Sequence, residues 1–238
     1  MEAQVTEGFS FKIDIVFCID VTEGMDPLVH SFQSRLPLLV AQLEARLSEK
    51  HKVADQIRIR IVAFGDCNVD TNPLNASPFY TVLPAEQTAD LNSFVSALSA
   101  NGGGDEPESG LEALAVAMAS DWTQEGDRQR HIIVMFTDAS AHRLEDRVGD
   151  IPPTFASQIP SSIDKITDGW EGGGQSASGV ATTLKQPARR LVLFAPDMYP
   201  WPTIGDSWAQ TLFLPSKAGE GLAEVEYDTI LEVLANSV

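Results

Sequence analysis

The sequence predicts a doubly wound α/β fold, in which a six-stranded, mainly parallel sheet is flanked by helices. Three short apolar runs are nearly continuous rather than alternating, as expected for strands that are covered on both faces. Helical patterns, with apolar residues at three- and four-residue steps, lie between the runs. Strands that alternate with helices favour a parallel sheet with right-handed crossovers.

The strands are predicted from their apolar and β-branched residues. The second one begins with alternation, and its arginines Arg58 and Arg60 indicate that one face of that end reaches solvent. The third and the last carry the weakest signal. The predicted strands cover residues 13–19, 57–64, 79–83, 131–136, 190–195 and 211–214.

The helices are predicted from apolar spacing and from capping residues. Asp26-Pro27 is typical of a helix start, because a capping side chain precedes proline at the first helical position. Pro37 is expected to kink this helix. The other predicted helices cover residues 88–100, 107–122 and 161–170, and a last one carries Tyr227, Ile230, Leu231 and Leu234.

Residues 143–187 form the least regular part of the chain. They contain Pro152-Pro153, the glycine run 172–174 and a stretch rich in Ser, Gly and Thr. A chain of 238 residues suits one large α/β domain. We therefore interpret residues 1–238 as a single domain, with residues 143–187 as an elaboration within it.

The charge balance argues against two classes of partner. The chain has 16 Lys and Arg against 34 Asp and Glu, a formal net charge of −18. Nucleic acids and anionic membranes need a positive face, so neither is expected to bind, whereas divalent cations and basic partners suit this charge. Residues 1–10 do not resemble a signal peptide, and no run of about 18 apolar residues occurs. With two cysteines, both expected to be reduced, a cytoplasmic location is expected.

Three acidic motifs, distant in sequence, are expected to meet at one edge of the sheet. The first strand ends in segment 20–26, Asp-Val-Thr-Glu-Gly-Met-Asp, and strand 131–136 ends in segment 137–140, Thr-Asp-Ala-Ser. Between these two in the chain, the second motif, segment 102–108, reads Gly-Gly-Gly-Asp-Glu-Pro-Glu and leads into a helix. Ligand sites of open α/β sheets lie beyond the carboxyl ends of the strands, where these motifs are predicted to be.

The chemistry of these motifs predicts a divalent cation site. Asp20 and Asp138 supply carboxylates at neighbouring strand ends, and Thr22 adds a hydroxyl. Oxygen ligands suit Mg²⁺, Mn²⁺ or Ca²⁺, whereas softer metals would need His or Cys. The three glycines of segment 102–104 lack the Lys-Ser/Thr of a phosphate-binding loop, so we interpret them as a tight turn that brings the loop close to the metal.

The same motifs resemble those of the von Willebrand factor type A domain family. Segment 20–24, Asp-Val-Thr-Glu-Gly, is similar to the Asp-x-Ser-x-Ser motif, whose metal-ion-dependent adhesion site binds Mg²⁺. Segment 104–108 resembles the Asp-x-Pro-Glu loop of integrin β-subunit I-like domains. Segment 136–139 together with His142 resembles the third signature of the group.

The resemblance implies an antiparallel edge strand and a role for each matching residue. Gly24 stands where the family has its second serine, so one hydroxyl ligand is missing, and either a water replaces it or the site is vestigial. The implied site residues are Asp20 and Thr22 as ligands, Glu108 as the loop ligand, Asp138 as the third-motif acid that often acts through water, and Asp105 and Asp26 as candidates for neighbouring metal sites.

In this family an acidic residue of a partner protein typically completes the metal coordination. The resemblance therefore implies a non-catalytic, metal-dependent protein-binding or adaptor module. One domain, few cysteines and no signal peptide favour the bacterial intracellular type, whose members commonly serve beside ATPases, kinases or phosphatases, including stress-response systems. The alternatives are a metal-dependent hydrolase that uses the same carboxylates to activate water, and a scaffold with a vestigial metal site.

Aromatic residues after strand 190–195 are candidates for the rest of the interface. This loop follows a strand's carboxyl end and should lie on the metal face, where exposed aromatic side chains often dominate binding. The predicted partner contacts are Tyr199, Trp201 and Trp208. The alternative is that both tryptophans pack against the irregular segment.

Overall fold

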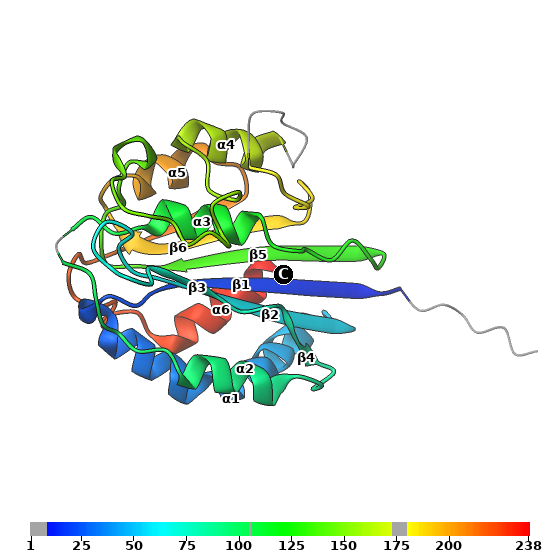
Figure 1. Ribbon diagram of the computed structural model, residues 1–238. Coiled ribbons are helices and arrows are strands. Elements are labelled where there is room, and N and C mark those ends of the chain that lie inside the picture. Colours follow the sequence, from blue (N-terminus) through cyan, green and yellow to red (C-terminus); the bar gives the residue numbers. More distant parts are fainter. Residues whose placement is uncertain (1–8, 105, 173–179) are drawn as a thin grey trace, which may run out of the picture.

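The computed structural model describes residues 9–104, 106–172 and 180–238. Its central sheet is covered by helices on both faces (Figure 1). The strands are β1 (Phe11–Asp20), β2 (Gln56–Phe64), β3 (Leu74–Ala76), β4 (Tyr80–Leu83), β5 (Arg128–Phe136), β6 (Arg189–Pro196) and β7 (Thr211–Ser216). The helices are α1 (Asp26–Glu49), α2 (Thr88–Ser96), α3 (Gly110–Met118), α4 (Ile163–Gly172), α5 (Trp201–Ser207) and α6 (Tyr227–Ser237), with 3-10 turns η1 (Glu23–Met25) and η2 (Leu144–Asp146).

The sheet confirms the predicted doubly wound fold. Its order is β3-β2-β1-β5-β6-β7, and β2, β1, β5, β6 and β7 run parallel. The antiparallel edge consists of two segments, because β3 pairs with residues 62–64 of β2 and β4 pairs with residues 57–59. Pro78, which has no N–H to donate, lies between them. The sheet therefore has seven strands where six were predicted.

The central position of β1 determines where the acidic motifs lie. β1 pairs along its length with both β2 and β5, and the register sets Asp20 opposite Phe64 and Ile19 opposite Phe136. The loops that follow these three strands therefore begin at the same edge of the sheet. Residues 13–20 of β1 are all buried, as the nearly continuous apolar run predicts.

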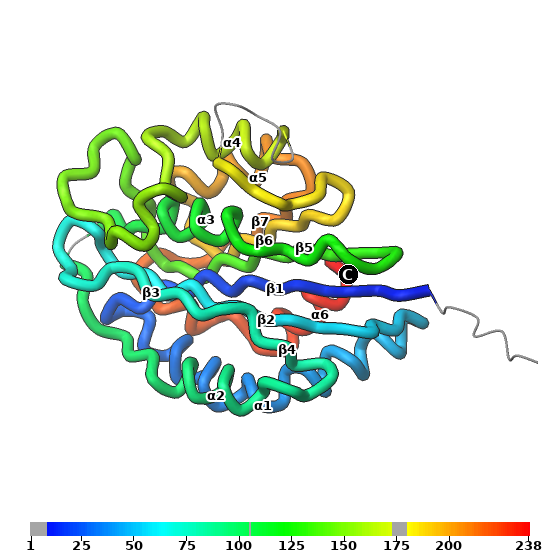
Figure 2. The backbone as a smooth tube through the Cα atoms, turned by 45° about the vertical axis from the view of Figure 1, so that its right-hand side comes forward, coloured from blue at the N-terminus to red at the C-terminus, as the bar shows by residue number. Residues whose placement is uncertain are grey.

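Two hydrophobic cores lie on opposite faces of the sheet (Figures 1 and 2). Helices α1, α2 and α6 cover one face, where the rings of Phe17 and Phe32 meet edge to face with their centroids 5.1 Å apart. Helices α3, α4 and α5 cover the other face. The irregular segment contributes Phe155, Trp170 and Leu184 to this second core, so its described residues pack with α3 and α5.

Several helices differ from their predicted bounds. Helix α1 continues through Pro37, whose side chain is exposed, and α2 ends at Ser96. Helix α3 begins only at Gly110, because the preceding backbone bonds across to another loop: the N–H of Glu108 donates to the carbonyl of Ser140 (2.9 Å). Strand β3 and helix α5 were not predicted. Within the described residues, no helix combines the length and apolarity needed to cross a bilayer.

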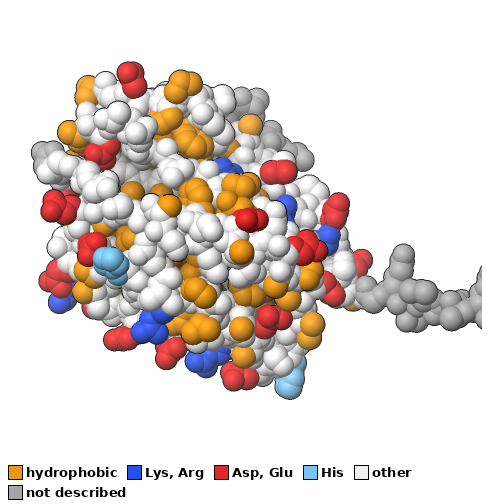
Figure 3. Space-filling model, turned by 60° about the horizontal axis from the view of Figure 1, so that its bottom comes forward, with side chains coloured by type: hydrophobic (Ala, Val, Ile, Leu, Met, Phe, Trp, Pro, Cys, Tyr) orange, Lys and Arg blue, Asp and Glu red, His pale blue; other side chains and the backbone are white. Residues whose placement is uncertain are grey.

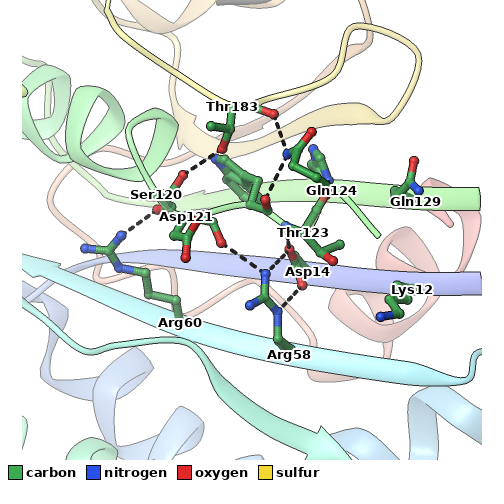
Figure 4. Close-up of polar contacts among 12 residues, drawn as sticks. Lys12, Asp14, Arg58, Arg60, Ser120, Asp121, Thr123, Gln124, Gln129 and Thr183 are labelled. Carbon is green, nitrogen blue, oxygen red and sulfur yellow. Dashed lines mark hydrogen bonds and ion pairs between the residues drawn. The ribbon is translucent and has the colours of Figure 1, made fainter. Parts of the chain in front are cut away.

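A buried ion pair ties the α3–β5 connection to the sheet at the end remote from the acidic motifs (Figure 4). The carboxylate of Asp14 is fully buried and accepts two hydrogen bonds from the Arg58 guanidinium, each 2.7 Å, and one from the N–H of Thr123 (2.7 Å). Arg58 also donates to the carbonyl of Asp121 (3.0 Å). One face of this end of β2 is partly exposed, as the alternation predicts, and 20% of the Arg58 side chain is exposed beside its pairing with Asp14.

His131 is buried in its neutral form beside this network. Its Nε2–H donates to the carbonyl of Thr123 (3.0 Å), its Nδ1 accepts from the N–H of Lys185 (3.4 Å), and its ring stacks on Trp122. Burial lowers the pKa of His131 to about 4, although the charge of Asp14 acts in the opposite direction. As the pH falls, the imidazole of His131 is therefore protonated in the unfolded chain at a higher pH than in the folded protein.

We predict that His131 makes the fold sensitive to acid. The contribution of His131 to the free energy of unfolding is complete above pH about 6.5. It decreases by about 3 kcal/mol as the pH falls to about 4. Urea unfolding of the wild type and of His131→Gln at about pH 7.5 and 4.5 tests this. The variant should lose less stability between the two values, and an equal loss in both proteins would contradict the prediction.

Candidate metal centre

The three acidic motifs surround a cavity of about 210 Å³ at the carboxyl edge of the sheet. The first motif, after β1, and the third, after β5, are joined there by the glycine-rich loop before α3. We call this site the acidic cavity. Its lining residues are Thr22, Glu23, Gly24, Gly102, Gly103, Gly104, Glu106, Glu108, Asp138, Ala139 and Gly219.

Asp20 lies beneath the cavity and is held by three hydrogen bonds. Its Oδ1 accepts from the N–H and the hydroxyl of Thr22 (3.0 and 2.7 Å), and its Oδ2 accepts from the hydroxyl of Thr137 (2.7 Å). The residue is fully buried. Burial raises the pKa of Asp20 to about 6, while the bonds from Thr137 and Thr22 oppose the rise and the nearby charge of Asp138 adds to it.

Asp138 connects the cavity to the loop between β7 and α6. Its Oδ2 accepts from the N–H of Gly221 (2.7 Å), and its carbonyl accepts from the N–H of Gly219 (2.9 Å). A Cβ on Gly24 would lie 3.4 Å from this same Oδ2, with no other heavy atom so near. The position of the missing serine therefore faces the Asp138 carboxylate.

Glu108 is the carboxylate with the least support from its surroundings. Its backbone forms an isolated parallel bridge with Ala141, and its side chain is only 6% exposed. Among the described residues, none hydrogen-bonds to its Oε2. Burial raises the pKa of Glu108 to about 9, and the charges of Asp20, Asp66, Asp70 and Asp138 raise it further.

The glycine run makes the predicted close approach to the site, but residues 101–104 form no hydrogen-bonded turn or sharp bend. Gly102 and Gly103 have φ values of +86° and +69°, which favour glycine. A Cβ on Gly103 would lie 2.7 Å from Oε1 of Glu108 and 2.9 Å from Cγ2 of Thr22. The glycine run therefore contacts two of the predicted metal ligands, Glu108 and Thr22.

Asp70, which sequence reasoning missed, holds the loop at Gly103 in place. Its carboxylate accepts from the N–H of Gly103 (3.0 and 3.1 Å) and from the N–H of Asp66 (2.8 Å). A Cβ on Gly65 or on Gly102 would come within 2.5 Å of the same carboxylate. The sequence shows Gly65 after β2 and Asp70 five residues later. It does not show that Asp70 bonds to a loop more than thirty residues away.

Asp66, another buried acid after β2, contacts His142. Its Oδ1 lies 3.2 Å from Nε2 of His142 and accepts from the N–H of Asn68 (2.8 Å). His142, which the third signature includes, thus contacts the β2–β3 connection. Neither Asp66 nor Asp70 lines the cavity.

Two predicted acids do not join this arrangement. Asp105 lies outside the described residues. Asp26 is 58% exposed at the start of α1, where it pairs with His30 (3.3 Å), and it does not line the cavity.

The predicted exposure of two aromatic residues is wrong. Trp201 is fully buried and donates from its indole nitrogen to the carbonyl of Ala139 (2.9 Å), so it supports the loop after β5 from within the core. Trp208 is 5% exposed and stacks on Trp170 of the irregular segment, as the alternative interpretation expected. Tyr199 is 37% exposed and remains available at the surface.

The cavity fits a hard divalent cation that is held by mixed oxygen donors. Its donors are carboxylates and the Thr22 hydroxyl, and one buried carboxylate oxygen of Glu108 has no partner. Among the described residues, no three His, Cys, Asp or Glu side chains come close enough to hold a metal by themselves. A cation here would need the hydroxyl and water as well, as Mg²⁺ commonly does.

Comparison with known proteins shows the fold but not the family. No family model matches the chain. A curated relative, the alpha-protein kinase vwkA of Dictyostelium discoideum, is 26% identical over 133 residues, which are 56% of this chain and 19% of the kinase. The pilus adhesin SpaC from Lactobacillus rhamnosus GG superposes with a TM-score of 0.53 and 10% identity over 94% of this chain and 30% of the adhesin, and its open conformation gives 0.51. The chain thus spans less than a third of the length of either protein.

We predict that Glu108 destabilises the metal-free protein. Because its pKa is raised from 4.5 to about 9, the folded state retains the proton that the unfolded chain releases, so stability decreases as the pH rises across this window. In chelator at about pH 8, Glu108→Gln should unfold at a higher temperature, with a gain on the order of 1–3 kcal/mol. The same substitution at an exposed position, Glu106→Gln, should alter stability little. Equal effects of both variants would sink the prediction.

Proposed function

We propose that this chain is a von Willebrand factor type A-like domain that binds a protein partner through a divalent cation. The cation would be held in the acidic cavity, and an acidic residue of the partner would complete its coordination. This is a binding function rather than catalytic turnover.

The observation that carries the proposal is that the carboxylates at the acidic cavity lack the counter-charge that two other buried carboxylates have. Asp14 pairs with Arg58 (2.7 Å) and Glu112 with Arg147 (3.4 Å). In the described structure, no Lys, Arg or His forms an ion pair with the buried carboxylates of the cavity, namely Asp20, Glu108 and Asp138. Like charges gathered without a counter-charge are costly, and a cation offsets that cost.

The residues present suit a cation that clamps rather than reacts. Thr22, Glu108 and Asp138 line the cavity, and Asp20 holds Thr22 in place while its own carboxylate remains close by. Mg²⁺ or Mn²⁺ would supply an electrophilic position for a partner carboxylate. Among the described lining residues there is no His, Cys or Lys, so a hydrolase here would have to use the same carboxylates as its base.

The similarity to a kinase supports an adaptor role. The matching region is 19% of that kinase, so a region similar to this chain occurs within a longer enzyme. An adaptor function beside an ATPase, kinase or phosphatase is therefore part of the proposal. A bacterial intracellular origin and a cytoplasmic location stay predictions from the sequence.

Calorimetric titration with Mg²⁺ and Mn²⁺ after chelation tests the metal site. We expect binding by the wild type, and loss of binding in Asp20→Ala and Asp138→Asn, because Asp138 lines the cavity and Asp20, beneath it, holds Thr22 of the lining. Asp26→Asn is the matched control, since Asp26 is exposed and does not line the cavity. No binding by the wild type at millimolar metal would leave a scaffold with a vestigial site.

The missing serine supplies a test in the opposite direction. Gly24 has no positive φ, and a Cβ there meets only Asp138 at 3.4 Å, so Gly24→Ser fits. The added hydroxyl should increase Mg²⁺ affinity on the order of tenfold, which corresponds to about 1.4 kcal/mol. Gly24→Ala controls for the altered backbone and should not increase affinity. A serine variant with unchanged affinity would show that this position is not a ligand.

A further inference from the structure

The charges around the acidic cavity restrict the kind of partner that can enter it. Every charged residue that lines the cavity is acidic: Glu23 and Glu106 are exposed at its rim, and Glu108 and Asp138 are buried within it. Among the described residues, neither Glu23 nor Glu106 has an ion-pair partner closer than 4.0 Å. The surface over α1, α2 and α6 differs, because basic and acidic side chains are interspersed there (Figure 3).

A bound dication does not neutralise this cavity. The buried carboxylates that would hold the cation offset its charge, whereas the rim carboxylates Glu23 and Glu106 are exposed and have no ion-pair partner among the described residues. The nearest basic residue in sequence to Gly219 of the lining, Lys217, is already paired with Glu220 (3.1 Å). A partner carboxylate would thus enter a region that is still negative, where like charges oppose it.

We propose that the acidic cavity selects a partner segment whose coordinating carboxylate is flanked by lysine or arginine. This inference rests on the proposed function, since it assumes that a partner carboxylate meets a cation in the cavity. The flanking cations pair with Glu23 and Glu106, while the central carboxylate passes between them to the metal. Partners with a carboxylate in an acidic or neutral surrounding are disfavoured by the same rim.

Fluorescence anisotropy with short labelled peptides tests the inference. Each peptide carries a central Asp flanked on both sides by Lys, Gln or Glu, and a second set carries Asn in place of Asp. Binding is measured to the full chain at saturating Mn²⁺ and in chelator, and the informative signal is the part that needs both Mn²⁺ and Asp. We expect affinity in the order Lys, Gln, Glu, and a Lys preference that shrinks as salt increases.

Charge-neutralising variants assign the preference to the rim. Glu23→Gln with Glu106→Gln should weaken the preference for Lys flanks by roughly threefold per carboxylate removed. Glu44→Gln with Glu86→Gln makes the same change in net charge at exposed sites: Glu44 lies in the last turns of α1, and Glu86 follows β4, which ends opposite Ile57 at the start of β2. This control should keep the preference. Folding of each variant is verified by its thermal unfolding.

The outcomes separate the two proposals. Binding that needs Mn²⁺ and Asp but is equal for all flanks, or that weakens equally in both double variants, overturns the charge selection and leaves the metal-dependent function standing. Absence of any signal that needs both Mn²⁺ and Asp overturns the proposed function, and the selection falls with it.

Discussion

The burial of Asp20 at the end of the central strand is the constraint on which the rest of the site depends. A fully buried carboxylate needs hydrogen bonds or a counter-charge, because its desolvation is costly. Here the donors are the N–H and hydroxyl of Thr22 and the hydroxyl of Thr137. These bonds join the loop after β1 to the loop after β5, so the first and third motifs are held in one arrangement before any ligand is present.

The remaining loops are fastened to this centre by hydrogen bonds to their backbone groups. The bridge between Glu108 and Ala141 joins the loop before α3 to the loop after β5, and the carboxylate of Asp70 holds the loop at Gly103 from the other side. Trp201 supports the same loops from the core through the carbonyl of Ala139. A site that is supported from several elements is preorganised, which limits the entropy lost when a ligand binds.

Asp14 and Glu108, two buried acids at opposite edges of the sheet, differ in their partners, and the contrast separates stability from function. At the edge near the start of β1, Asp14 is neutralised by Arg58 and ties the α3–β5 connection to two strands. At the carboxyl edge, Glu108 keeps an oxygen without a partner among the described residues. Groups whose pKa is shifted by burial and like charge gather at functional sites, because stability alone would not retain them.

The sequence by itself determined six of the strands and the three motifs, because apolar runs and the residues that end them are local features. It therefore predicted that Asp20 and Asp138 lie at one edge of a doubly wound sheet. Only the tertiary structure decided that Asp70 supports the loop at Gly103 and that Trp201 is buried. It also decided that the antiparallel edge consists of two strands, β3 and β4. These depend on contacts between segments far apart in the chain, where burial and pairing are set by neighbours that no local pattern encodes.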